Sequence, residues 1–336
     1  MEGKMKTIDL VINIGTRNTG IYQQGRGLII KEPSAVLISN RGGKMTLVES
    51  GRAAVQAPVD AKEQLLYPIK EGAVFHERAA VLMYKEFISR VLPFSPFKPK
   101  VRAIANISCG LTAVERRDVE NVLIRAGVGE VILLESPLAA AEFLGLDYAV
   151  IVDIGAGKTE IAVTSPSGIL SGCSVNIGGD AINQVIMDYV TDVFRQKIKF
   201  STAEKIKKSI LSFSPADNAS CVVESRSIQA DSASNLKLES RGIRQAVAPL
   251  IDKIAEAIVA VCAQMPTNIY EDVAASGMHL CGGSANIPAI DRYLADKLEW
   301  DAYVINEPDN ACVIGAAHFF DNPGKLGRLL NLKNLR

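Results

Sequence analysis

Apolar runs and amphipathic segments alternate along this chain of 336 residues. The mostly apolar run Ile8–Ile14 ends at Gly15, a pattern typical of a buried strand that enters a turn. Short extended stretches follow at 21–22 and 27–30, and together the three predict a meander. Further along, the spacing predicts a helix over 79–91, a strand over 101–108, a helix over 113–127, a strand over 130–134 and a helix over 137–145.

A second set of elements in a similar order begins at Tyr148. The segment Tyr148–Ile154 is again a predicted buried strand that runs into a glycine, Gly155. Alternating strands and helices predict an α/β protein. This second set comprises predicted strands over 160–164 and 169–174, helices over 181–196, 202–211 and 240–264, and a polar peripheral stretch over 213–235, in which the alternation over 221–228 suggests a hairpin.

The two sets share an internal repeat. The segment Asn13–Ile21 aligns without gaps on Asp153–Ile161, 140 residues later, and each copy lies between two predicted strands. A strand–glycine turn–strand hairpin can direct backbone N–H groups and hydroxyls at an anion, and glycine lets phosphates come close. A single copy would favour an ordinary β-turn. Two copies in matching contexts predict a phosphate clamp shared by two similar domains.

Two further glycine pairs fit the same picture. Gly178-Gly179-Asp180 precedes a predicted helix, and Gly282-Gly283-Ser284-Ala285-Asn286 follows a short apolar strand. A helix N-terminus behind glycines offers N–H donors to a phosphate or purine, although a tight strand-to-helix connection explains each pair equally well. Neither a dinucleotide-binding GxGxxG nor a P-loop GxxxxGK[ST] pattern is present.

Composition narrows the class of protein. The 37 Lys and Arg residues balance 37 Asp and Glu residues, which argues against broad electrostatic binding to nucleic acid. Apolar runs stay short of the roughly 18 residues that span a bilayer, and residues 1–6 lack the features of a signal peptide, so we expect a cytoplasmic protein. The six cysteines lack CxxC spacing and the three histidines lack ligand spacing, which favours reduced core thiols over a metal centre.

These motifs resemble the actin, heat-shock chaperone and sugar-kinase superfamily, and within it most closely the MreB group of bacterial actin homologues. The ordered matches extend over about 270 residues. They comprise Gly15-Thr16-Arg17-Asn18-Thr19, Glu32-Pro33-Ser34, Val114-Glu115-Arg116-Arg117, Pro137-Leu138-Ala139-Ala140-Ala141, Asp153-Ile154-Gly155, Gly178-Gly179-Asp180, Thr202-Ala203-Glu204 and Gly282-Gly283-Ser284-Ala285.

The resemblance implies an actin-like (ribonuclease H-like) α/β fold with duplicated domains around a nucleotide cleft that holds ATP and Mg²⁺. It places domain I at 1–146 and domain II at 147–336, with small peripheral subdomains near 31–76 and 180–240, and allows the helix over 311–336 to return to domain I. It also implies head-to-tail filaments at the inner face of the cytoplasmic membrane. Such filaments organise wall synthesis through membrane partner proteins and maintain a rod shape.

Family roles carry over to particular residues of this chain. Glu204 and Lys207, one helical turn apart, would reach the ribose and base, although an exposed i,i+3 ion pair is the ordinary explanation. The implied nucleotide-binding set is Gly15, Thr16, Arg17, Asn18 and Thr19 in the first phosphate loop, Gly155, Ala156, Gly157, Lys158 and Thr159 in the second, Gly178, Gly179 and Asp180 before a helix, Glu204, Lys205, Ile206 and Lys207, and Gly282, Gly283, Ser284, Ala285 and Asn286 at the adenine.

Three positions depart from the family pattern. Asn13 stands where the family has an Asp that helps to hold hydrated magnesium, which leaves Asp153 as the charged metal residue. Ser136 stands where the family has a Glu that is a candidate to orient the attacking water, and the adjacent Glu135 lies at a strand end with its side chain expected to point elsewhere. Lys158 replaces a small residue and adds a cation. We therefore predict ATP binding with slow or absent hydrolysis.

The segment Leu92–Lys100 corresponds to a loop that dips into the membrane surface in some relatives. Phe94 and Phe97 with the nearby lysines suit shallow insertion into an anionic membrane, while a proline-rich loop folded on the core is the alternative. The basic, leucine-containing tail 325–336 favours a capping helix on the core over a second membrane element.

Two other functions compete with a cytoskeletal scaffold. A sugar or acid kinase of the same superfamily would use the same clamp for phosphoryl transfer, but needs an acidic base that the sequence does not reveal. A non-filamentous, non-hydrolysing regulator of filament-forming paralogues would account for the three departures. Fold-level similarity alone does not choose among them.

Overall fold

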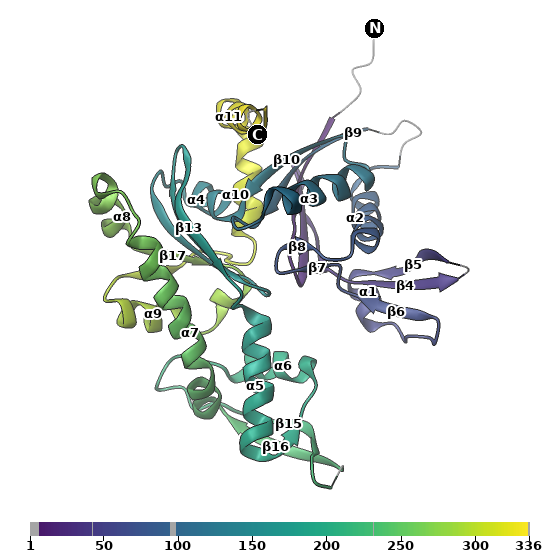
Figure 1. Cartoon of the computed structure of the whole chain (residues 1–336), viewed down its shortest axis with the longest axis vertical. Coiled ribbons are helices and arrows are strands. Elements are labelled where there is room, and N and C mark those ends of the chain that lie inside the picture. Colours follow the sequence, from purple (N-terminus) through teal and green to yellow (C-terminus); the bar gives the residue numbers. More distant parts are fainter. Residues whose placement is uncertain (1–6, 42, 95–98, 231, 335–336) are drawn as a thin grey trace. The chain divides into compact units, whose positions relative to one another are not determined.

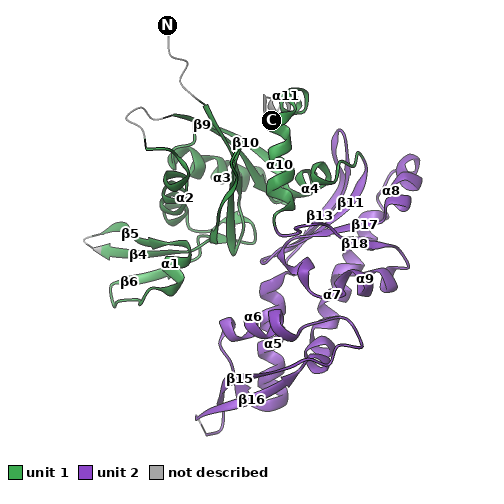
Figure 2. Cartoon of the chain, turned by 180° about the vertical axis from the view of Figure 1, so that it is seen from behind, with its two compact units in different colours: residues 1–147, 310–336 green, residues 148–309 purple. Residues whose placement is uncertain are grey.

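The computed structural model describes residues 7–41, 43–94, 99–230 and 232–334. The chain forms two compact units (Figure 2). The first unit comprises Met1–Asp147 together with Asn310–Arg336, and the second comprises Tyr148–Asp309. The chain therefore returns to its first unit at its C-terminal end.

A five-stranded mixed sheet forms the centre of the first unit (Figure 1). In spatial order its strands are β10 (Glu130–Glu135), β9 (Lys100–Ile107), β1 (Thr7–Asn13), β2 (Asn18–Gln23) and β3 (Gly27–Pro33). The first three strands in sequence form the predicted antiparallel meander, and β9 and β10 add parallel to the other side of β1. The central strand β1 is buried on both faces, which explains its nearly continuous apolar run.

The second unit has a sheet with the same connectivity. In spatial order its strands are β13 (Gly168–Val175), β12 (Thr159–Ser165), β11 (Ala149–Ile154), β17 (Met278–Cys281) and β18 (Ala302–Val304). Again three antiparallel strands come first, and two parallel strands follow beside the central β11. The internal repeat of the sequence therefore corresponds to a repeated sheet topology.

Helices cover both faces of the first sheet. On one face, α2 (Glu77–Val91) and α3 (Ala113–Arg125) bury apolar residues such as Phe87 and Val122 against the Leu10 side of β1. On the other face, α10 (Ala311–Asp321) lies on β1, β2 and β9, where Phe320 packs under the Arg102 guanidinium at 5.2 Å. Successive side chains of a strand point to opposite faces. The even-numbered side chains of β1 therefore face α2 and α3, and the odd-numbered ones face α10.

Helix α10 also packs closely on α4 (Ser136–Leu144). A Cβ atom added at Gly315 would lie 1.9 Å from the Ala139 carbonyl oxygen and 2.9 Å from Cβ of Phe143. Glycine at this position therefore allows the two helix backbones to approach.

The prediction of one C-terminal helix over 311–336 is wrong. Asn322 has extended backbone angles, and α11 (Pro323–Asn334) begins at the proline that follows. A proline lacks the N–H that a continuous helix needs, but it suits the first position of a new one. Helix α11 packs on α10 and β10, with Leu326 buried and Lys325 Nζ donating to the Glu142 carboxylate at 2.6 Å.

The longest helix of the second unit packs on its central sheet. Helix α7 (Ser240–Cys262) lies along β12 and β13 and also packs on α5 (Gly179–Phe194). Ile186, Val247 and Ile251 form part of the core between these elements. The helices of this unit are α5 (Gly179–Phe194), α6 (Phe200–Ile210), α7 (Ser240–Cys262), α8 (Tyr270–Ser276) and α9 (Ile290–Leu298), with short 3-10 turns η1 (Thr267–Ile269) and η2 (Gly283–Asn286).

Each unit also has a small peripheral sheet. In the first unit, β4 (Val36–Arg41) pairs with β5 (Lys44–Ser50) and β6 (Glu63–Leu66). Helix α1 (Gly51–Gln56) follows β5. The two-residue strands β7 (Ile69–Lys70) and β8 (Ala73–Val74) pair with each other after β6. In the second unit the order is β14 (Gln196–Lys197), β15 (Ser220–Ser227) and β16 (Ala233–Glu239). The hairpin suggested by the alternation over 221–228 is confirmed, because this segment is β15, which pairs antiparallel with β16.

Candidate functional site

The repeated glycine motif forms two hairpins with the same register. Asn13 at the end of β1 lies opposite Gly20, and Asp153 near the end of β11 lies opposite Glu160. The residue numbers of the second pair exceed those of the first by 140, which is the offset between the two sequence copies. The hairpins are therefore equivalent parts of the two sheets.

The first hairpin closes at Gly15. A Cβ atom at this position would lie 2.1 Å from the Asn18 carbonyl oxygen, so only glycine fits the turn. Ser34 stabilises the turn, because its hydroxyl donates to the Gly15 carbonyl at 2.7 Å and its backbone N–H donates to the Arg17 carbonyl at 2.9 Å. The buried Thr19 hydroxyl lies 2.9 Å from the Ser34 hydroxyl, which gives Thr19 a structural role.

The tip of this hairpin contacts the peripheral part of the first unit. The Thr16 hydroxyl accepts a hydrogen bond from the Gly72 N–H at 3.1 Å. The Arg17 guanidinium lies 4.8 Å from the centre of the Tyr67 ring, within the range of a cation–π contact. Residues near β7 and β8 therefore hold the loop in place.

The second hairpin is fastened to the start of α5. The Gly155 N–H donates to the Lys158 carbonyl at 2.9 Å within the turn. The Gly179 N–H donates to the Gly155 carbonyl at 3.0 Å, and the Asp180 N–H donates to the Ala156 carbonyl at 2.8 Å. These two N–H groups therefore stabilise the hairpin. The glycine pair before α5 thus forms a tight connection between the preceding strand and the helix.

A second close contact involves the segment Gly282–Asn286. Gly282 has a φ of +83°, and a Cβ atom there would lie 2.3 Å from Oδ1 of Asp153. The Ser284 hydroxyl donates to the Gly155 carbonyl at 3.2 Å. The turn η2 therefore lies beside the second hairpin and next to the carboxylate of Asp153, while Gly283 and Asn286 are exposed.

Helix α6 contributes a buried cation, Lys207, beside the start of α5. Lys207 is only 8% exposed, and its Nζ donates to the Gly179 carbonyl at 3.0 Å and to the Glu204 carboxylate at 2.7 Å. The explanation of an exposed i,i+3 pair is therefore wrong for Lys207. Lys205 is exposed and Ile206 belongs to the hydrophobic core, so the side chains of these two residues point away from Lys207 and Glu204.

The electrostatics of Glu204 follow from its partners. Partial burial raises the pKa of Glu204, but hydrogen bonds from Lys207, Lys208 and Asn183 outweigh it and lower the pKa to about 2. Burial lowers the pKa of Lys207, and the Glu204 carboxylate opposes that effect. Near neutral pH the pair is a charged one, with Glu204 anchored from three sides.

In the first unit, Glu135 and Ser136 occupy the end of β10 and the start of α4. The Glu135 carboxylate lies 2.8 Å from the Arg116 guanidinium on α3, so it points to the α3 face of the sheet. The Ser136 hydroxyl donates to the Ile107 carbonyl at 3.2 Å. Asn13 lies on the opposite face from Glu135, because Glu135 is in register with Ile107 and Asn13 with Asn106, its neighbour in β9.

The predicted set omits three polar residues near these motifs. Ser34 supports the first hairpin, Asn183 holds Glu204, and Asn106 is a buried amide beside Asn13. Asn106 has a sequence signal, because a lone amide interrupts the apolar strand over 101–108, and Ser34 belongs to the Glu32-Pro33-Ser34 match. Ser34 and Asn183 lie far in sequence from the atoms that they contact.

The membrane-related residues lie after α2. Phe94 is fully exposed, and Phe97 lies outside the described residues. Within the described part of the chain, every helix is too short or too polar to cross a membrane.

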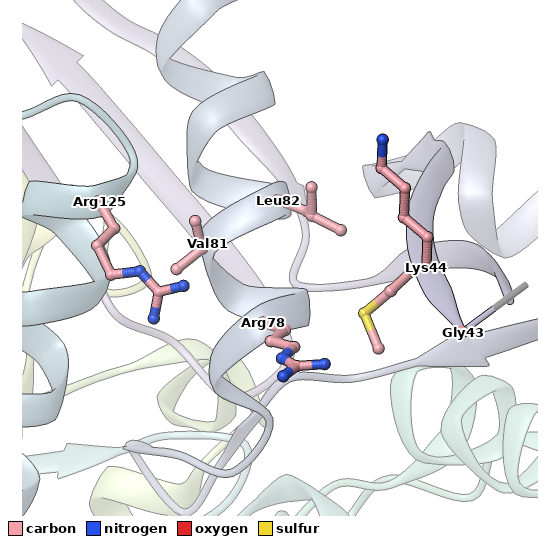
Figure 3. A pocket seen from close by; sticks show the side chains of 7 residues that line it. Gly43, Lys44, Arg78, Val81, Leu82 and Arg125 are labelled. Atoms are coloured by element: carbon pink, nitrogen blue, oxygen red, sulfur yellow. The ribbon is translucent and has the colours of Figure 1, made fainter.

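A separate pocket of about 400 Å³ lies in the first unit (Figure 3). Val81 and Leu82 of α2 form part of its apolar wall, and Lys44, Arg78 and Arg125 add positive charge. Arg125 is also ion-paired with Glu77. The lining contains none of the glycine-hairpin residues, so this pocket is not the candidate nucleotide site.

Comparisons with solved structures define the class of fold. MreB5 of Spiroplasma citri, solved bound to ADP, matches with a TM-score of 0.87 and 25% identity over 96% of this chain and 98% of that chain. A chain of the MamK double helical filament matches with a TM-score of 0.79 and 15% identity over 94% of this chain and 99% of that chain. The predicted actin-like fold is therefore confirmed.

Sequence comparisons define the family. The family model described as MreB/Mbl protein matches residues 7–328. The cell shape-determining protein MreB of Escherichia coli (strain K12) is 33% identical over 316 residues, which cover 89% of each chain, and the cell shape-determining protein Mbl of Bacillus subtilis (strain 168) is 26% identical over 95% of this chain and 97% of that protein. This chain belongs to the MreB/Mbl family.

Proposed function

We propose that this protein binds ATP with magnesium and assembles with copies of itself into filaments that determine cell shape. The observation that carries the proposal is the pair of glycine hairpins with identical register, one in each unit. Relatives named as cell shape-determining proteins, and the ADP-bound MreB5, support it. In this proposal both hairpins contribute to binding of the triphosphate.

The second unit supplies the nucleoside part of the proposed site. Gly282–Asn286 would contact the adenine, and Glu204 with Lys207 would lie toward the ribose and base. The buried contact of Lys207 with the Gly179 carbonyl supports this assignment, because it fixes the helix α6 side chains relative to the start of α5. Arg17 and Lys158, one on each hairpin, supply positive charge toward the phosphates.

Magnesium fits the oxygen donors at the ends of the central strands. Asp153 offers a carboxylate and Asn13 an amide oxygen, and Mg²⁺ prefers such oxygen ligands together with several waters. Glycine at position 282 lets the backbone approach Asp153 closely, because a Cβ there would lie 2.3 Å from Oδ1 of Asp153. These two residues would hold the ion through its water shell, and the ion would offset the negative charge of the phosphates.

We further propose that hydrolysis is slow or absent. Ser136 has no carboxylate with which to orient a water, and its hydroxyl is already bonded to the Ile107 carbonyl. Glu135 is paired with Arg116 on the other face of the sheet. A missing general base typically lowers a rate by about 10²–10⁴.

Electron microscopy and sedimentation of the purified protein with ATP and Mg²⁺ test the proposal. We expect filaments that require nucleotide, with little phosphate release over the same period and more release from the variant Ser136→Glu. ATP binding without polymer would instead favour a non-filamentous regulator. Phosphate transfer to a member of a sugar panel would favour a kinase, and absence of ATP binding would refute the proposal altogether.

We propose that the filaments lie at the inner face of the cytoplasmic membrane, where they would meet membrane proteins of wall synthesis. The fully exposed Phe94 supports this, since an aromatic side chain gains free energy by entering the interface. Phe94→Ser is expected to reduce co-sedimentation with anionic liposomes about five- to tenfold. The control is Phe75→Ser, which removes another exposed phenylalanine and should leave binding unchanged. Equal pelleting of Phe94→Ser and the parent would remove the membrane proposal.

A further inference from the structure

The amide of Asn106 lies beside that of Asn13 at one end of the first sheet. The two residues are register partners on the parallel strands β9 and β1. Side chains of directly opposed residues in neighbouring strands point to the same face, with strands about 4.8 Å apart. Asn106 therefore projects on the same side as the residue that precedes the first hairpin.

The amide of Asn106 is buried and differs in its pairing from Arg102 on the same strand. It is 1% exposed, and within the described chain neither Nδ2 nor Oδ1 has a hydrogen-bond partner. Arg102, on the same face of the same strand, is fully engaged by the Asp9 carboxylate at 2.7 and 2.8 Å. A buried amide that is left unpaired destabilises a protein, and an apolar residue would avoid that loss. The unpaired donor and acceptor of Asn106 indicate a bound molecule that can both accept and donate.

The neighbouring strand ends explain which molecule suits this place. The carboxyl ends of the parallel strands β1, β9 and β10 lead to Asn13, Asn106 and Ser136, and all three side chains are uncharged. Ligands of α/β sheets bind outside the carboxyl ends of the strands. A carboxylate at such a place repels a triphosphate unless a cation lies between them, whereas an amide does not.

We propose that Asn106 is a positioning residue of the nucleotide site: together with Asn13 it holds, by hydrogen bonds, the water that contacts the phosphates and their hydrated cation. This inference rests on the proposed binding of ATP. Because both residues are neutral, they add no carboxylate to that of Asp153, and they therefore add nothing to the dependence of ATP affinity on magnesium. This water would give the Asn106 amide the partner that it lacks among the described residues.

Isothermal titration calorimetry with ATP, in excess Mg²⁺ or in EDTA, tests the inference together with the thermal midpoint of the nucleotide-free protein. Asn106→Leu is expected to weaken ATP binding about tenfold, the equivalent of one hydrogen bond, and to raise the Tm of the free protein. Asn13→Asp is expected to make binding strongly dependent on Mg²⁺. The control Ile104→Val, on the same face of β9, should lower the Tm slightly and leave ATP affinity unchanged.

The possible failures are distinct. If the parent does not bind ATP, the proposed function and this inference both fall. If the parent binds ATP and Asn106→Leu binds it equally well, only the role of Asn106 is overturned. A lower Tm of free Asn106→Leu would also overturn it, because the amide would then be satisfied without nucleotide.

Discussion

Gly15→Ala is expected to weaken ATP binding by about two orders of magnitude. The added Cβ would lie 2.1 Å from the Asn18 carbonyl oxygen, so the first hairpin must open and its N–H groups must move. A displacement of about 1 Å in a positioned group can cost about 100-fold. Calorimetric titration with ATP measures the effect, and circular dichroism verifies that the variant is folded.

The second hairpin supplies the control for this experiment. A Cβ at Gly155 would lie 3.1 Å from the Lys158 carbonyl oxygen, a contact that a small shift can relieve. Gly155→Ala is therefore expected to keep ATP affinity within about tenfold of the parent, in accordance with the modest cost of a tight contact. Equal losses in the two variants would show that the tighter turn at Gly15 is not the cause.

Gly315→Ala is expected to lower the free energy of unfolding of the first unit by about 3 kcal/mol, at the upper end of the usual cost of overpacking. The new methyl group would overlap the Ala139 carbonyl, which is backbone and cannot rotate away. Relief requires α10 to move away from α4. Urea denaturation followed by circular dichroism measures the change.

Gly327→Ala in α11 is the matched control, because a Cβ there has no neighbour within 4 Å among the described residues. Alanine is the better helix former, so this variant should be unchanged or more stable by about 0.5–1 kcal/mol. A Gly315→Ala protein with the stability of Gly327→Ala would contradict the close packing of α10 on α4.

Local patterns predicted the fold because its signals are short-range. The strand β1, the meander after it and the matching β11 all follow from apolar runs that end at glycine, and the shared 140-residue offset predicted the repeated topology. The same reasoning failed where the signal was ambiguous. The tail near Asn322 has enough helix formers to hide the interruption before Pro323.

The site was predicted only at the level of motifs. Gly15, Gly155 and Gly282 were selected because glycine marks turns and close approaches, and the structure gives each of them a backbone or side-chain neighbour that excludes a Cβ. Their role toward nucleotide stays a prediction. Ile206 shows the limit of a motif, since it lies between two predicted ligand residues yet faces the core.

The amino-acid order alone determined the α/β class and the duplicated strand–glycine–strand units, because each depends on neighbours within a few positions. Only the tertiary structure decided that Lys207 is buried against Gly179, that Glu135 pairs with Arg116, and that the Asn106 amide has no partner among the described residues. The physical reason is that burial and hydrogen bonding depend on which distant segments pack together, and that packing sets the solvent access and the partners of every side chain.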